Sequence, residues 1–143
     1  QCNCGRRGCW ERYASATGLI NQTKYAMADN ANSLMHKIAS ENGGVDGKTA
    51  FLAKDAGDEA GRNVVEQYLH YLSEGLLNLA YVLHPEMFII GGGISHEGKN
   101  VMDPLREKLN ESLQSSGMLP LIEIVQASLG NNAGIIGAAA LVM

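Results

Sequence analysis

The sequence opens with Gln1-Cys2-Asn3-Cys4-Gly5-Arg6-Arg7-Gly8-Cys9-Trp10-Glu11, a stretch that contains every cysteine of the 143-residue chain. A Cys-x-Cys pair needs an extended turn to direct both sulfurs to one point. Gly5 and Gly8 allow the chain to fold back so that Cys9 joins the other two thiols. Three thiols brought together in this way favour a metal site.

Zinc is the metal that clustered thiolates hold in structural sites, but such a site nearly always has four ligands, and this stretch supplies three. Either the fourth ligand lies outside this chain, or the site is open, or there is no metal. The simpler alternatives are three reduced thiols in a tight loop, or one disulfide and a spare thiol. An odd number of cysteines argues against a secreted disulfide framework.

The charged residues around the cysteines have ordinary explanations as well as functional ones. Arg6 and Arg7 would favour the thiolate form of their neighbours, although two arginines are also typical of a solvated loop tip. Glu11 falls in the first turn of a predicted helix, where the helix dipole favours an acid. Glu11 gains a functional meaning only if the loop over residues 2–9 that carries the cysteines, the cysteine loop, holds it in a cleft.

Composition places the chain among ordinary globular domains, with 45% hydrophobic and 18% charged residues. The net charge of −4 gives no electrostatic reason to expect nucleic acid or an anionic membrane as a partner of this segment. No apolar run reaches the roughly 18–20 residues that span a bilayer, and no signal peptide is recognised. We therefore expect a cytoplasmic protein. Because the chain begins without Met and directly on a motif, we also expect it to be a fragment of a longer protein.

The first two thirds of the chain are predicted to be helical. A helix over 12–27, interrupted near 15–18, is followed by a short helix over 33–39 and another over 49–57. Asp58 caps the longest helix, which His84-Pro85 ends. Its apolar residues are spaced by four and three, which predicts one continuous buried stripe: Val65, Leu69, Leu72, Leu76, Leu79 and Leu83.

A strand over 87–90 is wholly apolar, which is typical of a strand buried on both faces of a parallel sheet. It leads into Gly91, Gly92 and Gly93, where the backbone can approach a flat or charged ligand at the carboxyl edge of the sheet. The glycines fit neither a Walker loop nor Gly-x-Gly-x-x-Gly. They indicate either a nucleotide site or a plain strand-to-loop turn.

The remaining residues continue the alternation of strands and helices. Asp103-Pro104 is predicted to start a helix whose Leu105, Leu109 and Leu113 face inward. A second strand over 121–125 and a last helix over 134–142 follow. Strand, helix, strand and helix in this order imply a parallel crossover.

Three stretches together resemble one family. Residues 2–11 resemble the Cys-x-Cys-Gly-x-x-Gly-Cys-x-Glu signature of the ROK family (repressors, open reading frames and kinases). Residues 88–95, Phe-Ile-Ile-Gly-Gly-Gly-Ile-Ser, resemble its adenosine-side glycine motif, and 129–139 resemble its closing Leu-Gly-x-x-Ala-Gly-x-x-Gly-Ala-Ala. The segment 14–18 is similar to that of bacterial glucokinases.

The resemblance implies an α/β fold, namely the C-terminal portion of an actin-like (ribonuclease H-like) sugar-kinase fold, helix-rich with a short parallel sheet. Residues 1–143 would form one C-terminal domain fragment, in which 1–11 are a zinc-binding loop and 87–143 an adenosine-side β-α-β-α unit. By this resemblance Cys2, Cys4 and Cys9 are zinc ligands, and Glu11 hydrogen-bonds sugar hydroxyls. Gly91, Gly92 and Gly93 would form the adenosine wall.

The implied activity is transfer of the γ-phosphate of magnesium-bound ATP to the 6-hydroxyl of a hexose, with glucose the expected sugar and a homodimer the common assembly. The zinc-binding histidine, the phosphate loops and the catalytic aspartate of the family are expected upstream, so the fragment alone would be inactive. Asn131-Asn132 depart from the acidic residue often found there. The alternative is the effector-binding domain of a sugar-responsive ROK repressor, since repressors of the family keep the cysteine signature. A third possibility is a self-associating module that pairs through exposed strand edges.

Overall fold

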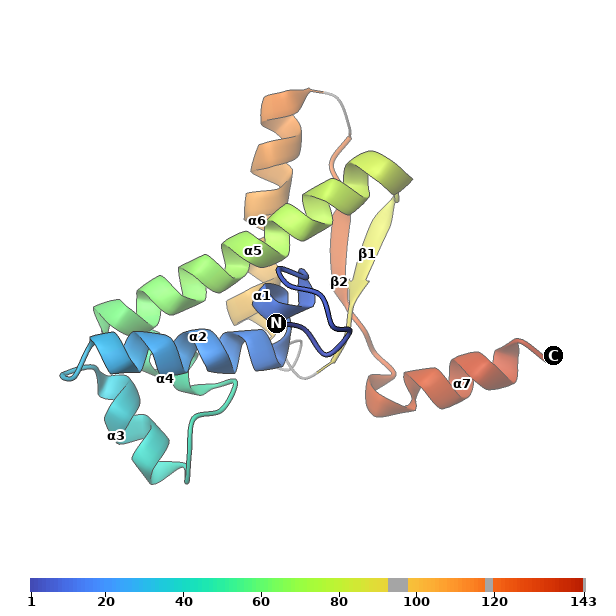
Figure 1. Ribbon diagram of the computed structural model, residues 1–143. Helices are drawn as coiled ribbons and strands as arrows, with labels where there is room; N and C mark the ends of the chain where they lie inside the picture. Colours follow the sequence, from blue (N-terminus) through green and yellow to red (C-terminus); the bar gives the residue numbers. More distant parts are fainter. Residues whose placement is uncertain (93–97, 118–119, 143) are drawn as a thin grey trace.

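One long helix, α5 (Glu59–Leu83), runs through the middle of the structure, and most other elements pack around it (Figure 1). The computed structural model describes residues 1–92, 98–117 and 120–142. The elements before α5 are α1 (Glu11–Ala14), α2 (Ala16–Asp29), α3 (Leu34–Glu41) and α4 (Thr49–Asp55). Those after it are β1 (Met87–Ile90), α6 (Lys99–Ser116), β2 (Glu123–Gln126), the 3-10 turn η2 (Gly130–Asn132) and α7 (Ala133–Ala140).

The predicted apolar stripe of α5 is buried over most of its length. Its first four members lie in the core, but Leu79 and Leu83 are 37% and 65% exposed. The prediction was therefore wrong for the last turns of α5, where Ala80 is the fully buried residue in place of Leu79 and Leu83. Tyr68, which the stripe missed, is fully buried and donates a hydrogen bond to the Ala14 carbonyl at 2.8 Å. Burial raises the pKa of Tyr68 to about 12.

Side-chain caps begin three of the helices. The Ser15 hydroxyl accepts from Gly18 at the start of α2, and the Ser33 hydroxyl accepts from Met35 at the start of α3. Asp58 accepts from Gly61 at the start of α5 and also from the Leu34 N–H at 2.7 Å. One carboxylate therefore joins the N-termini of α3 and α5, although Leu34 and Asp58 are 24 positions apart in the chain.

The sheet consists of β1 and β2 in parallel, with Met87 opposite Glu123 and Ile90 opposite Gln126. This confirms the predicted parallel pairing. Helix α6 contributes the predicted inward leucines, and its Arg106 donates to the Ile124 carbonyl of β2 at 2.8 Å. The predicted start of α6 was wrong, because the helix begins at Lys99 and continues through Pro104.

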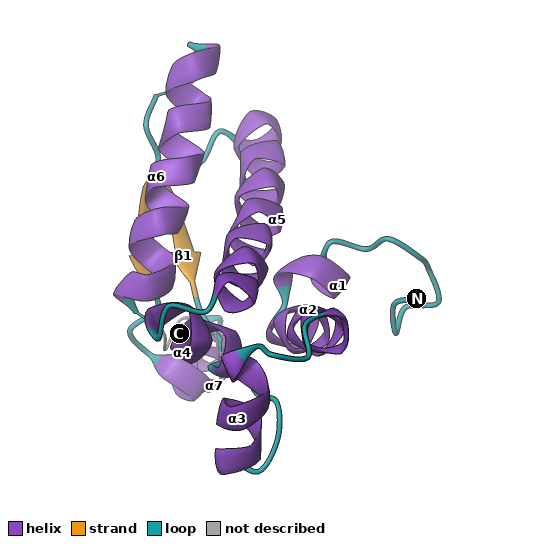
Figure 2. Ribbon diagram, turned by 90° about the vertical axis from the view of Figure 1, so that its left-hand side faces the viewer, coloured by secondary structure: helices purple, strands orange, loops and turns teal. Residues whose placement is uncertain are grey.

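The two faces of β1 differ. Met87 and Ile89 are 42% and 66% exposed, whereas Phe88 and Ile90 pack against the core. A strand buried on both faces was therefore a wrong prediction for these residues, because the described elements cover one face only. Figure 2 shows α5 and α6 side by side with the strands behind α6.

Helix α7 extends away from the body of the structure (Figure 1). It has no buried residue, although it is rich in apolar side chains, and its Ile135 is 74% exposed. Among the described residues, no helix combines the length and the apolar character needed to cross a membrane.

We predict that Asp58→Ala lowers the free energy of unfolding by about 1–2 kcal/mol, the usual cost of removing a helix cap. Urea denaturation checks this. Asp55→Ala is the matched control, because Asp55 is an exposed aspartate whose only described ion pair, with Lys54, lies at the surface. Equal destabilisation by both changes would contradict the capping role.

The stabilisation by Asp58 is expected to depend on pH. Partial burial raises the pKa of Asp58, but hydrogen bonds from Gly61, Leu34 and Ser33 outweigh it, and the net pKa is lowered. The contribution is therefore fully present above the unfolded-state pKa of about 3.9 and is lost as the pH falls through the lower folded-state value. The difference between the wild type and Asp58→Ala should shrink in that acidic range. A difference that is constant down to about pH 2 would exclude the carboxylate as its source.

Candidate functional site

The cysteine loop brings the three thiols together. The sulfurs of Cys2, Cys4 and Cys9 all lie within 4.8 Å of one another, and those of Cys4 and Cys9 are 3.5 Å apart. The Cys2 N–H donates to the Arg6 carbonyl at 2.8 Å and closes the turn. Gly5 and Gly8 have φ of +86° and +73°, which residues with a Cβ rarely adopt. The fold-back predicted from these two glycines is present.

The geometry of the three sulfurs fits a zinc ion. Tetrahedral coordination with Zn–S bonds of about 2.3 Å places sulfurs about 3.8 Å apart, which is close to the spacing of this loop. All three cysteines are free rather than disulfide-bonded. Among the described residues, no histidine or carboxylate joins the group, so the donor set is three thiols. Cys2, Cys4 and Cys9 are the residues that could hold the metal.

Hydrogen bonds within the loop shift the pKa values of Cys4 and Cys9 in opposite directions. The Arg6 N–H, followed by the thiols of Cys9 and Cys2, donates to the Cys4 sulfur and lowers the pKa of Cys4. The hydrogen bond to Cys4, followed by desolvation, raises the pKa of Cys9 to about 11. Cys4 therefore ionises before Cys9. The sequence suggested that the arginine side chains would favour a thiolate, whereas here the Arg6 backbone amide is the largest contribution.

Glu11 is the first residue of α1, two positions after Cys9, and its side chain is exposed. Helix α1 has only four residues and buries none of them. So short a helix is not stable by itself, and contacts made by its neighbours in sequence must fix the direction of Glu11. The Arg12 N–H, which donates to the Cys9 carbonyl at 2.9 Å, joins the cysteine loop to α1.

Gly91 and Gly92 follow β1 at its carboxyl end and are both exposed. The Ala127 N–H donates to the Ile90 carbonyl at 2.8 Å and extends the pairing of the two strands up to this point. Gly92 has φ of +86°, so the turn itself requires glycine there. Gly93, the third predicted residue, lies outside the described residues.

The structure does not bring the two predicted sites into one cluster. In Figure 2, α5 stands between β1 and the loop that leads from the N-terminus to α1. The cysteine loop and Glu11 therefore form one candidate site, and the glycine turn forms another.

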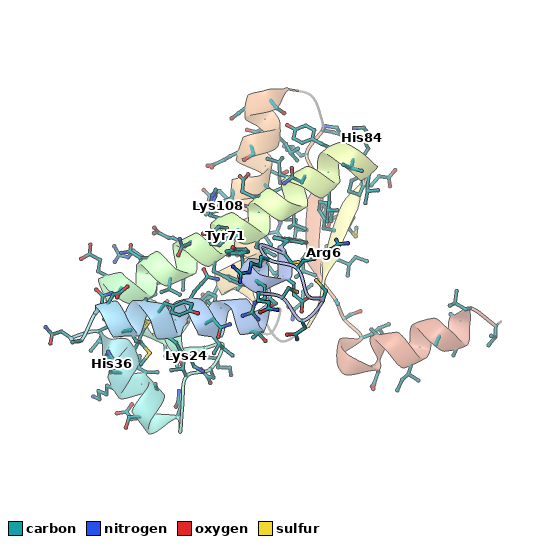
Figure 3. All side chains as sticks on the ribbon, viewed as in Figure 1. Arg6, Lys24, His36, Tyr71, His84 and Lys108 are labelled. Carbon is teal, nitrogen blue, oxygen red and sulfur yellow. The ribbon has the colours of Figure 1, made fainter. Side chains whose placement is uncertain are left out.

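Residues that sequence analysis did not select attach the start of α1 to α5. The Trp10 indole N–H donates to the Tyr71 carbonyl of α5 at 2.8 Å, and the indole lies against Gly75. Tyr71 extends toward α1 (Figure 3), where its ring centroid lies 5.0 Å from that of Tyr13. The available signal was Gly75 itself, because a glycine inside a long helix costs about 1 kcal/mol relative to alanine and so indicates a packing requirement.

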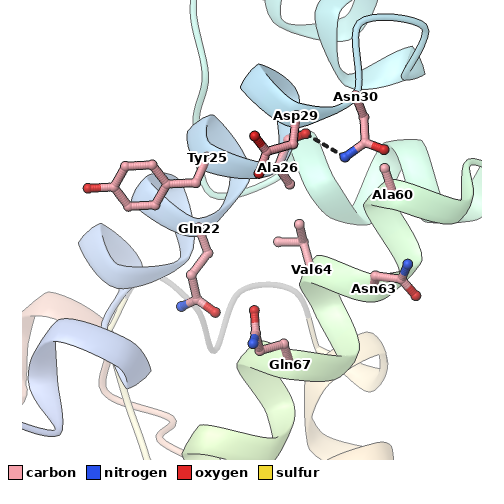
Figure 4. A pocket seen from close by; sticks show the side chains of 9 residues that line it. All are labelled: Gln22, Tyr25, Ala26, Asp29, Asn30, Ala60, Asn63, Val64 and Gln67. Atoms are coloured by element: carbon pink, nitrogen blue, oxygen red, sulfur yellow. Dashed lines mark hydrogen bonds between the residues drawn. The ribbon is translucent and has the colours of Figure 1, made fainter.

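A polar pocket of about 300 Å³ lies between α2 and α5 (Figure 4). Its polar lining includes Gln22, Asn63 and Gln67, and Ala60 and Val64 supply apolar surface. The Gln22 side-chain N–H donates to the Tyr13 carbonyl at 2.9 Å, whereas its carbonyl oxygen is buried without a partner among the described residues. No sequence motif pointed to this pocket.

Comparison with known proteins gives matches along the whole chain. The model of the ROK family matches residues 1–143. A glucokinase of Streptomyces coelicolor is 34% identical over 141 residues, covering 96% of this chain and 44% of that protein. A glucokinase of Halalkalibacterium halodurans is 35% identical, covering 95% and 41%. An N-acetyl-D-glucosamine kinase of Escherichia coli O127:H6 is 32% identical, covering 97% and 40%.

The structural comparison agrees with these matches. A crystal structure of a ROK family glucokinase from Streptomyces griseus, in complex with glucose and AMPPNP, superimposes with a TM-score of 0.83 at 32% identity. The match covers 98% of this chain and 46% of that one. It confirms the predicted actin-like sugar-kinase fold. The chain thus spans less than half the length of the relatives it matches.

We predict that the chain binds about one Zn²⁺ through its three thiolates, and that Cys2→Ser, Cys4→Ser or Cys9→Ser weakens binding by at least about tenfold. With only three protein ligands, a strong chelator should remove the metal. Competition with a chromophoric zinc indicator under reducing conditions measures the zinc affinity of each variant and the release of zinc to the chelator. Reduced wild-type chain that takes up no zinc, or zinc that resists the chelator, would contradict this prediction.

Proposed function

The chain belongs to the ROK family, and we propose that it forms the sugar- and adenosine-binding part of an ATP-dependent hexose kinase, with glucose as the sugar. The observation that carries this proposal is the match along nearly the whole chain to glucokinases, one of which was crystallised with glucose and AMPPNP. The proposed reaction transfers the γ-phosphate of ATP to the sugar 6-hydroxyl.

Glu11 is proposed to accept hydrogen bonds from sugar hydroxyls. A carboxylate suits this task because charge-assisted hydrogen bonds are about twice as strong as neutral ones. It also gives selectivity, since an analogue that lacks the hydroxyl leaves a desolvated carboxylate without its partner. The exposed position of Glu11 at the start of α1 supports this role, because a ligand can reach the carboxylate.

Cys2, Cys4 and Cys9 are proposed to hold zinc in a structural role. When bound, the zinc would supply no chemistry to the reaction and would cross-link the loop that precedes Glu11. A loop fixed in this way limits the motion of α1 and keeps the carboxylate in its binding position. The spacing of the three sulfurs supports this proposal.

Gly91, Gly92 and Gly93 are proposed to form the wall against which adenosine binds. Without side chains, this segment lets the backbone approach a flat base, and it follows β1 at the edge where α/β folds commonly bind ligands. The exposure of Gly91 and Gly92 supports the assignment.

Phosphoryl transfer further requires a general base for the sugar hydroxyl, Mg²⁺ on the triphosphate and closure around both substrates. The residues proposed here bind and orient sugar and adenosine, and none of them is a base positioned at the hydroxyl. We propose that the base, an aspartate, precedes these residues in the natural protein.

The test is a phosphorylation assay of the natural protein at its full length, with ATP and a panel of glucose, mannose, fructose and N-acetylglucosamine. We expect turnover with glucose at the highest kcat/KM. N-Acetylglucosamine is the most informative alternative substrate, because an N-acetyl-D-glucosamine kinase also matches nearly the whole of this chain. Folded, zinc-loaded protein that phosphorylates no sugar would contradict the kinase proposal and favour a sugar-responsive repressor.

We predict that Glu11→Gln lowers kcat/KM for glucose by about 10- to 100-fold, the loss expected for one hydrogen bond to a charged group. Glu59→Gln is the matched control, because Glu59 is also an exposed glutamate at the first position of a helix. Steady-state kinetics at saturating ATP separate the two variants. Similar kinetics for the wild type and Glu11→Gln would exclude Glu11 from sugar binding.

The 143-residue chain by itself is expected to show no ATP-dependent phosphorylation of glucose, because the proposed base is not among its site residues. A coupled assay for glucose 6-phosphate measures this, with the full-length protein as positive control. Turnover by the purified chain above the contaminating background would place a base within these 143 residues.

A further inference from the structure

Gly75 stands in the middle of the 25-residue helix α5, where glycine is among the least favourable residues. A Cβ added at this position would lie only 2.0–2.3 Å from three atoms of the Trp10 indole, far inside van der Waals contact. The indole therefore occupies the space in which any other residue would place its side chain. At this point α5 is shaped to receive Trp10.

The same absence of a side chain exposes a backbone acceptor. In an α-helix the carbonyl of Tyr71 lies one turn before residue 75, and a side chain at that position leans back over it. Because residue 75 is glycine, the Trp10 indole N–H reaches the Tyr71 carbonyl at 2.8 Å. Trp10 is thus held both by shape and by a directional hydrogen bond.

A second contact attaches the chain that follows Glu11 to α5. The Tyr13 ring packs on the Tyr71 ring with centroids 5.0 Å apart and planes inclined by 52°. Trp10 and Tyr13 flank Glu11 in sequence, and both are anchored on the same turns of α5. Since α1 buries no side chain of its own, these anchors determine where the Glu11 carboxylate points.

We propose that Gly75 is a positioning residue for sugar recognition: by receiving the Trp10 indole it locks α1 onto α5 and fixes Glu11 toward the sugar. The lock consists of Trp10, Tyr71 and Gly75. This inference rests on the proposed function, in which Glu11 binds the hexose. It requires no contact between Gly75 and any substrate.

The test uses Gly75→Ala in the natural full-length protein. The added methyl group must displace the indole, so we expect kcat/KM for glucose to fall about 10- to 100-fold, chiefly through a higher KM. The KM for ATP should stay within about twofold, because the glycine turn lies across α5 from the lock. Gly47→Ala is the control, since a Cβ at Gly47 meets nothing within 4 Å.

Trp10 is the only tryptophan of the 143 residues, so in the isolated chain its fluorescence reports the lock without any enzymatic activity. We expect Gly75→Ala to shift the Trp10 emission to the red, because the displaced indole becomes more exposed to water. Gly47→Ala should leave the Trp10 emission unchanged. Wild-type emission from Gly75→Ala would overturn the proposal.

A double-mutant cycle separates positioning from general loss of stability. Without the indole there is nothing to displace, so Trp10→Ala with Gly75→Ala should be no worse for glucose than Trp10→Ala alone. Trp10→Phe removes the indole N–H and changes no residue of α5, so it remains a usable test if Gly75→Ala fails to fold. We expect Trp10→Phe to raise the glucose KM by a smaller factor than Gly75→Ala does. Additive effects of the two alanine substitutions, or equal loss for glucose and ATP, would overturn the proposal.

The controls also distinguish this inference from the proposed function. Wild-type protein that neither phosphorylates nor binds a hexose overturns both. Wild-type protein that phosphorylates glucose, with Gly75→Ala indistinguishable from it, overturns the lock alone.

Discussion

The rest of the structure depends on the burial of one face of α5. Leu19 of α2, Phe51 of α4 and Leu105 of α6 are fully buried in one core cluster with this face. Burying each such side chain contributes about 1.5–3 kcal/mol. Because α1 also packs on α5, this helix is the common support of the core and of Glu11, the residue proposed to bind sugar.

Much of the fold was predictable because its signals are local. Asp58, as a helix cap, and His84-Pro85, as a stop, define α5 from neighbouring residues alone. The convergence of the three thiols followed from their spacing and from Gly5 and Gly8, since the eight residues from Cys2 to Cys9 have few ways to close into a loop. The sequence pattern also indicated the parallel β1-α6-β2 unit, which the structure confirms.

What the sequence did not predict depends on residues far apart in the chain. The exposure of Leu83 and Ile89 follows from which surfaces the neighbouring elements reach, and periodicity carries no information about that. The contact of Trp10 with Gly75 joins positions 65 residues apart, so neither residue identifies the other. Gly75 was nevertheless visible as an unfavourable residue inside a strong helix, and it marked a tertiary contact rather than a break.

Cys9, Trp10 and Glu11 are adjacent in the chain. Three consecutive residues are therefore proposed to bind the metal, to attach α1 to α5 and to bind the sugar. Inserting a single residue among them would turn the start of α1 by about 100° and separate the proposed metal ligand, the anchor and the carboxylate together. In evolutionary terms, this region should tolerate substitution better than a change of length. Insertions and deletions among related proteins are therefore expected in the loop over 42–48, whose residues 42–44 are exposed, rather than between Cys9 and Glu11.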